Sequence, residues 1–485
     1  MADMLAGLKH KFVKGAASAA LVLMPMGALA ETLTDAMISA YKHSGLLEQN
    51  RALLRAADED VAVAVAALRP TLNYVANWTY TDRSSTFSGD DTLTGSVGLS
   101  SSLLLYDFGA SKLRIDIAKE TVLATRDALT LVEQQVLFLA VSAFMDVRQA
   151  ADSIALQSNN VRLLTQELRA ANDRFEVGEV TQTDVAQAQA RLAAARAAEG
   201  AAQGQMAIAR EAYKAATGHY PGALATPPRA PMTATTLEEA KAIARRTHPD
   251  MLRAQRQVTI ADLGVQLALS SMKPSVSASA STTLNIGASQ GVVTDAAGDP
   301  IMPITRHPND YFTSSVGVSV SGPIYQGGAL SALYRQALAQ AEAQRANLHV
   351  VRHTVDQNVG NAWAQLAIAT AQIEATDRQI RASRVALRGA REEASLGART
   401  TLDVLNAEQE LLDAEDARLT AGVDQYLAVY QLLSSMGLLT ADHLRLGIVT
   451  YDPEAYYNTV STAPVRQVSP QGEKLDAVLK ALGKQ

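Results

Sequence analysis

The sequence predicts a mainly helical protein made of two tandem repeats, each with a strand hairpin and a very long helical hairpin. The first observation is that the chain from Tyr106 to Gly218 is repeated from Tyr325 to Gly437 at a constant offset of 325 − 106 = 219 residues. The second is that apolar residues in both copies recur at alternating spacings of three and four, as in a coiled-coil seam. The third is a set of short segments in which apolar and polar residues alternate.

The long helices come from the repeated part of the chain. Identical apolar positions occur in both copies, among them Leu129, Val132, Val136 and Ala143 in the first and Leu348, Val351, Val355 and Ala362 in the second. Residues 109 to 177 contain no proline, and at ~1.5 Å per residue such a helix is on the order of 100 Å long. We expect helical hairpins at about 109–217 and 328–437, within repeats that span 31–230 and 231–450.

Each hairpin is predicted to turn at a short tip, at 175–185 in the first repeat and at 394–404 in the second. Gly178 and Gly397 lie where a helix would end with a left-handed residue. The Thr and Asp residues that follow can cap the next helix. Shorter helix pairs are expected before each strand hairpin.

The strands are predicted at about 70–106 and 274–325, two in each repeat. Apolar residues alternate with polar ones in all four, for example from Leu72 to Tyr80 and from Val316 to Val320. This pattern fits a transmembrane barrel with a wet interior, and it also fits a soluble sheet packed on one side. In a barrel, an interfacial aromatic girdle would include Trp78, Tyr80, Phe87, Tyr311 and Phe312. A 15-residue insertion in the second copy is expected in a loop between strands.

The N-terminus favours the barrel. Residues 1–30 contain three lysines, an apolar run from Ala16 to Met24 and then Ala28-Leu29-Ala30, which is typical of a cleaved signal peptide. Without that segment, which carries three lysines and Asp3, the net charge changes from −6 to −8, and this argues against a nucleic-acid partner. No later segment has ~18 uninterrupted apolar residues. The chain has no cysteine for a disulfide, a thiolate metal site or a lipid anchor.

Four strands cannot close a membrane barrel, because an unpaired strand edge in lipid is very costly. Closure must therefore be shared between chains. Two chains would give eight strands around a filled lumen, whereas three would give twelve strands and room for a pore. We expect three.

The duplicated tips and the strand exits at Tyr106-Asp107-Phe108-Gly109 and Tyr325-Gln326-Gly327-Gly328 resemble the TolC-type outer membrane efflux protein family over about residues 31–450. The resemblance implies a homotrimer in the outer membrane of a Gram-negative bacterium, with a twelve-stranded barrel in outer-membrane lipid and a twelve-helix periplasmic tunnel. It implies a passive exit duct for efflux or type I secretion, without enzyme activity or cofactor. The implied partners are a periplasmic adaptor (membrane fusion) protein and an inner-membrane pump, either proton-driven or an ABC exporter.

The resemblance also implies roles for residues at the tips. Asp403 would form a ring of three carboxylates around the periplasmic aperture, and Asn406 stands where the family commonly has a second acidic residue. Arg399 matches an arginine that bonds to the first tip, at Thr183 or Asp184, and Ala394 replaces a tyrosine that often adds another link. The adaptor-docking tips would be Val177, Gly178, Leu396 and Gly397.

Simpler interpretations of these residues stay open. Asp184 and Asp403 are also placed to stabilise a helix N-terminus, and Gly178 and Gly397 to serve only as turn residues. His349 and His353 have the spacing of a metal pair, but no neighbouring ligand type supports a site, and we interpret them as solvated or interhelical. No catalytic motif was found.

The main rival function is a structural or adhesive periplasmic coiled-coil protein without a pore. If the chain is a duct, the sequence leaves open whether it carries small toxic compounds, polypeptides or both. Residues 451–485 have no counterpart in the repeat and are expected to form a flexible tail, with a short amphipathic helix at Lys474–Leu482.

Overall fold

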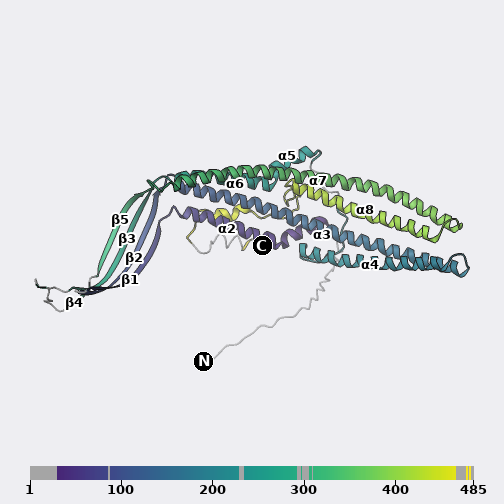
Figure 1. Cartoon of the computed structure of the whole chain (residues 1–485), viewed down its shortest axis with the longest axis horizontal. Helices are drawn as coiled ribbons and strands as arrows, with labels where there is room; N and C mark the ends of the chain where they lie inside the picture. Colours follow the sequence, from purple (N-terminus) through teal and green to yellow (C-terminus); the bar gives the residue numbers. More distant parts are fainter. Residues whose placement is uncertain are drawn as a thin grey trace, which may run out of the picture.

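The computed structural model describes residues 30–85, 88–228, 234–291, 297, 305–308, 310–465, 477–478 and 480–481. The molecule is elongated, with a β-sheet at one end and two helical hairpin tips at the other (Figure 1). Apart from Ala30, the predicted signal peptide lies outside the described residues, as does Phe87 of the predicted aromatic girdle.

Two long helices run through the helical part of the molecule. They are α3 (Ala110–Glu176) and α7 (Ala329–Ser395), both 67 residues long and related by the same offset as the sequence repeat. Each turns back into a shorter helix, α4 (Gln182–Thr217) and α8 (Thr401–Ser435). Small buried residues such as Ala171, Ala188 and Ala390 allow the paired helices to approach closely. The two-repeat fold predicted from the sequence is confirmed.

Shorter helices complete the half of the molecule that lies nearer the sheet. They are α1 (Leu33–His43) and α2 (Gly45–Ala66) in the first repeat, and α5 (Leu237–Thr247) and α6 (Pro249–Ser270) in the second. Helices α2 and α6 lie beside the long helices toward the sheet, whereas α4 and α8 lie beside them toward the tips (Figure 1). Helix α3 contacts both α6 and α8, and both of these contact α7.

The sheet is antiparallel and contains β1 (Thr71–Ser85), β2 (Ser88–Tyr106), β3 (Ser275–Gly291), β4 (Thr305–Pro308) and β5 (Tyr311–Ser321). Strand β2 pairs with both β1 and β3, and β3 pairs with β4 at one end and with β5 at the other. The sequence predicted one partner strand for β3 in the second hairpin, whereas the structure has two, β4 and β5. The predicted insertion belongs to the loop between β3 and β4, of which residues 292–296 and 298–304 lie outside the described residues. Among the described strands, the outer edges of β1 and β5 have no partner.

The two faces of the sheet differ as the sequence predicted. Large apolar side chains on one face are exposed, including Tyr74 at 85% and Val316 at 89%. Hydroxyl groups pair across the strands on the other face, as between Ser277 and Ser319 at 2.8 Å. A soluble sheet would bury its apolar face, but no described part of this chain covers it.

The main hydrophobic core lies near the middle of the helical part. It joins residues of α1, α3, α4, α5, α7 and α8, with Leu137, Phe144, Tyr213 and Leu433 among its most buried members. One stretch of α3 is apolar enough to cross a membrane by length and composition alone. Its residues Leu137, Val141 and Phe144 pack into this cluster, so the stretch is accounted for as a core helix.

The C-terminal region differs from the expectation of a flexible tail after residue 450. Residues Pro453–Val460 form α9, which packs on α2, and Val460 is only 1% exposed. Arg126 on α3 contacts Glu454, and Arg69 donates to the backbone carbonyls of Thr462 and Ala463. The prediction of a flexible tail is wrong for this segment, because contacts with residues far away in the sequence hold it in place. Of the predicted Lys474–Leu482 helix, residues 477, 478, 480 and 481 are described and helical.

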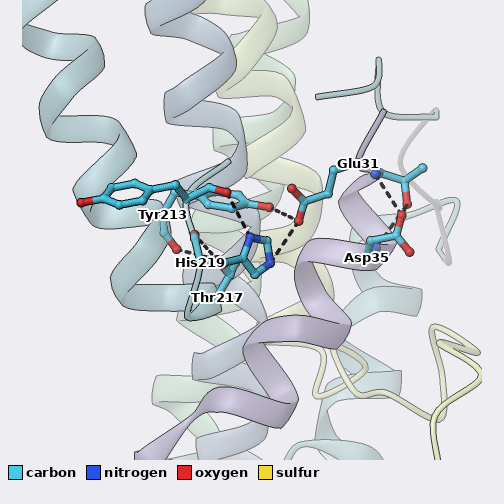
Figure 2. A network of polar contacts seen from close by, with 7 residues as sticks. Glu31, Asp35, Tyr213, Thr217 and His219 are labelled. Atoms are coloured by element: carbon cyan, nitrogen blue, oxygen red, sulfur yellow. Dashed lines mark hydrogen bonds and ion pairs between the residues drawn. The ribbon is translucent and has the colours of Figure 1, made fainter. Parts of the chain in front are cut away.

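The start of the described chain is held against the end of α4 (Figure 2). The Tyr213 hydroxyl donates to the Glu31 carboxylate at 2.5 Å, and His219 Nε2 lies 3.5 Å from the same carboxylate oxygen. The backbone of Glu31 is hydrogen bonded to Ala223 and Ala225. These contacts tie the first helix to the connection between the repeats.

Candidate functional site

The first hairpin tip is a tight turn between α3 and α4. Gly178 has a φ of +78°, and the backbone N–H of Glu179 donates to the Arg174 carbonyl at 2.9 Å. This is the left-handed helix ending that the sequence predicted, and a residue with a side chain would be strained there. Thr181 then caps α4 by accepting a hydrogen bond from the backbone N–H of Asp184.

The second tip repeats this geometry between α7 and α8. Gly397 has a φ of +74°, and the N–H of Ala398 donates to the Glu393 carbonyl at 2.9 Å. Thr400 caps α8 in the same way that Thr181 caps α4. Both tips therefore present the same short, rigid turn.

The two predicted aperture carboxylates complete these caps. Asp184 accepts from the backbone and hydroxyl of Thr181 at 2.9 and 2.7 Å, and Asp403 accepts from Thr400 at 3.0 and 2.8 Å. The hydrogen bonds from these threonine side chains lower the pKa of both carboxyls. Both groups are therefore ionised at neutral pH. Within one chain, the hydrogen bonds of Asp184 and Asp403 are those of helix caps.

Arg399 lies at the second tip but bonds within its own hairpin. Its Nε donates to Glu393 at 2.5 Å, and no hydrogen bond among the described residues joins it to Thr183 or Asp184. Thr183 is exposed on the first tip. The expected bond between Arg399 and the first tip is therefore not formed within this chain. Ala394, which stands where the resembling family often has a tyrosine, packs in the small apolar cluster of the second hairpin.

A different pair of residues links the two hairpins near the tips. Arg191 on α4 donates to the side-chain oxygen of Asn406 on α8 at 3.0 Å. Asn406 was expected only as a neutral member of the aperture ring. Sequence reasoning missed its partner because Arg191 lies seven residues beyond Asp184, outside the tip motif, and the bond depends on how the hairpins are placed.

A second link between the hairpins lies deeper in the helical bundle. The Arg391 guanidinium contacts Glu408 at 2.5 Å and Glu167, on the other hairpin, at 3.4 Å. Glu408 is 7% exposed, and its burial raises the pKa of its carboxyl. Two carboxylates thus share one guanidinium, which makes this contact sensitive to protonation.

The predicted docking residues are exposed at the end of the molecule. The exposed fractions are 71% for Val177 and 84% for Leu396, each adjacent to a left-handed glycine. Each tip therefore exposes one large apolar side chain beside its glycine. His349 and His353, by contrast, are both exposed on α7, far along the chain from the tips.

Comparison with known proteins identifies the family. A profile of the outer membrane efflux protein family matches residues 39–219 and 242–438, which include both long hairpins and the sheet. The chain belongs to this family. It is a protein of the Gram-negative outer membrane with a large periplasmic part, and its family and fold are those of channel proteins rather than enzymes.

Individual relatives support the same assignment. The outer membrane efflux protein BepC of Brucella suis biovar 1 is 36% identical over 439 residues, which cover 90% of this chain and 92% of BepC. The outer membrane protein TolC of Escherichia coli K12 is 25% identical, with 93% and 90% covered. The alkaline protease secretion protein AprF of Pseudomonas aeruginosa is 26% identical, with 79% and 80% covered.

The fold is shared with solved channel structures. A crystal structure of CusC superposes with a TM-score of 0.71 at 18% sequence identity, covering 84% of this chain and 92% of CusC. The mainly helical fold with a small sheet and two tandem repeats, predicted from the sequence, is thus found in known members of this structural class.

Proposed function

We propose that three copies of the chain form a passive duct across the outer membrane and periplasm. The observation that carries this proposal is the sheet. It has four strand positions, the fourth divided between β4 and β5, with open outer edges, an exposed apolar face and hydroxyls on the opposite face. In lipid, open edges must be paired, and joining β1 of one copy to β5 of the next satisfies both. Three copies give twelve strands, which leave a water-filled lumen.

The helical hairpins continue the duct into the periplasm. Helices of 67 residues reach on the order of 100 Å from the barrel, so the tips lie far from the outer membrane. The exposed Val177 and Leu396 with their glycines form the surface that a periplasmic adaptor (membrane fusion) protein covers. An inner-membrane pump, proton-driven or an ABC exporter, supplies the energy, and the cargo is small toxic compounds, polypeptides or both.

The tips form a selective periplasmic aperture. Threefold symmetry turns Asp403 into a ring of three ionised carboxylates, which attracts cations and repels anions. The bond between Arg191 and Asn406 and the contacts of Arg391 hold the two hairpins of each copy together above the aperture. Arg399, which is engaged by Glu393 in the single chain, remains available to reach Thr183 or Asp184 of a neighbouring tip in the assembly.

Single-channel recording in planar bilayers tests the duct and its aperture. Wild-type trimers should give a small, cation-preferring conductance. Asp403→Asn keeps a side-chain oxygen for the helix cap and removes the charge, so cation preference should fall. Asp35→Asn makes the same change in the equivalent capping box of α1, away from the tips, and serves as the matched control.

The outcomes separate the alternatives. Unchanged selectivity in Asp403→Asn, or an equal loss in Asp35→Asn, would move the selective constriction away from Asp403 while keeping the duct. The absence of conductance from properly assembled protein would favour a structural or adhesive periplasmic protein without a pore. Heat-modifiable trimers in outer-membrane fractions would exclude that rival.

A further inference from the structure

A polar cavity of about 700 Å³ lies where α8 ends and α6 begins, between α3 and α7. Its volume is in the range of small-molecule binding sites. Side-chain amides dominate its lining, which includes Gln134, Gln135, Asn358, Asn361, Gln365 and Gln431. Neither the family assignment nor the proposed periplasmic aperture depends on this cavity.

The charges around the cavity exclude an ionic ligand as its main occupant. Its described lining contains no lysine or arginine that would attract an anion. The lone carboxylate, Asp250, is already paired with Arg253 at 3.0 Å. Amides and the hydroxyl of Ser434 both donate and accept hydrogen bonds, so the lining suits an uncharged ligand that does the same.

One buried donor at this cavity has no hydrogen-bond acceptor among the described residues. Gln134 is only 2% exposed, and its side-chain Nε2 has no partner. His248 is 8% exposed, and its Nδ1 accepts the backbone N–H of Asp250, which leaves the proton of the neutral ring on Nε2. Burial lowers the pKa of His248 and so favours the neutral ring. A buried donor without an acceptor is costly, and a ligand carbonyl would remove that cost.

On α3, the residues that line the cavity and the residues buried against α1 and α5 lie on different faces of the helix. Residues 131, 134, 135 and 138 line it, with the spacing of one helix face. Residues 137, 140 and 144 are buried in the core that α1 and α5 complete. In the proposed duct, α1 and α5 are placed on the outside of the helical tunnel. The cavity then opens toward the lumen, about halfway along the helical part.

We propose that this cavity is a lumen-facing binding site for uncharged amide groups, such as the backbone of an extended polypeptide in transit. A peptide group offers one donor and one acceptor, and a glutamine or asparagine side chain can pair with both at once. Leu131 and Phe138 add an apolar wall for neighbouring side chains. The inference rests on the proposed function, because only in a closed duct does the cavity face a passing solute.

Current block in planar bilayers tests the site. The probe is the neutral, end-blocked hexapeptide acetyl-(Gly-Ser)₃-amide, added on the periplasmic side of open wild-type channels. It should block the current reversibly, and Gln134→Leu should raise the half-blocking concentration about tenfold. Gln431→Leu changes an exposed residue of the opposite wall, so it tests the same site without disturbing a buried position. Gln157→Leu removes another α3 glutamine with an unpartnered oxygen, away from the cavity, and should leave the block unchanged.

Each of the following outcomes would contradict a specific part of the proposal. Open channels that the peptide does not block, or that it blocks equally in all variants, would reject the site and keep the duct. Maltotriose that blocks at the same concentration, with the same dependence on Gln134, would reject the peptide assignment in favour of sugar hydroxyls. If assembled protein forms no channels at all, the proposed function fails and this inference fails with it.

Discussion

Arg191 on α4 donates a hydrogen bond to Asn406 on α8, with 3.0 Å between the guanidinium nitrogen and the amide oxygen. The two residues belong to different repeats and lie close to the tips of different hairpins. Asn406 stands one turn beyond Asp403, where the family resemblance implies a second acidic residue and this chain has an amide. The amide thus accepts a charge-assisted hydrogen bond that joins the two hairpins.

Breaking this link should loosen the aperture. In Arg191→Gln the bond is lost, and since exposed links of this kind contribute ~0.2–1 kcal/mol, the open population should rise by no more than about fivefold. The mean single-channel conductance of purified trimers measures this change. Arg196→Gln, an exposed position on the same helix, is the control and should behave as wild type. An unchanged conductance in Arg191→Gln would show that the link does not restrain the aperture.

The parts of the site that follow from local sequence were predictable. Gly178 and Gly397 adopt the left-handed conformation, and Thr181 and Thr400 cap the returning helices, because these features depend on residues a few positions apart. The alternating strands and the long helices follow from periodicity in the same way.

Features that depend on how distant segments pack could not be predicted. The partners of Asn406 and Glu408 lie on other helices, and no spacing in the sequence indicates them. Arg399 was matched to the first tip by its position, but within the chain it donates to Glu393 of its own hairpin. The docking of α9 was missed because this segment has no copy in the other repeat and is held by residues such as Arg126, far away in sequence.

The contact of Arg391 with Glu408 and Glu167 should stabilise the two hairpins near their tips. Arg391→Leu leaves Glu408 buried without its cation, which should cost about 1–3 kcal/mol after allowance for the partial exposure of Arg391. Hydrogen exchange of residues 387–411 should become faster. Adding Glu408→Gln removes the unpaired charge and should recover most of the protection. Arg388→Leu, on the exposed side of the same helix, is the control; a similar effect there would contradict the proposed role of the contact.

A buried carboxyl on α2 should make stability depend on pH. Asp58 is 0% exposed, neither of its oxygens has a hydrogen-bond partner in the described structure, and burial raises its pKa from 3.8 to about 6 despite the nearby Arg126. The folded protein therefore binds this proton more tightly than the unfolded chain does. The resulting stabilisation is complete below about pH 4 and is lost as the pH rises to about 6.

Asp58→Asn should remove this dependence. The variant should be more stable than wild type at pH 7.5, by about 2 kcal/mol after allowance for screening by solvent, and nearly equal to it at pH 4. Thermal unfolding followed by circular dichroism at both pH values measures the difference. Asp60→Asn, an exposed change in the same helix, should have little effect at either pH. A variant less stable than wild type at pH 7.5 would show that the ionised carboxylate is favourably paired.

The hydroxyl of Tyr213 should anchor the beginning of the described chain, just before α1. This side chain is 0% exposed, burial raises its pKa above the usual value, and the neutral phenol donates to Glu31 at 2.5 Å (Figure 2). Tyr213→Phe keeps the packing and removes the donor, at a cost of about 1–2 kcal/mol. Hydrogen exchange of residues 31–36 should accelerate roughly 5- to 30-fold, since 1.4 kcal/mol corresponds to a factor of ten. Tyr220→Phe loses only exposed bonds, to Glu211 and Lys214, and should change this segment far less. Equal acceleration in both variants would argue against an anchor at Tyr213.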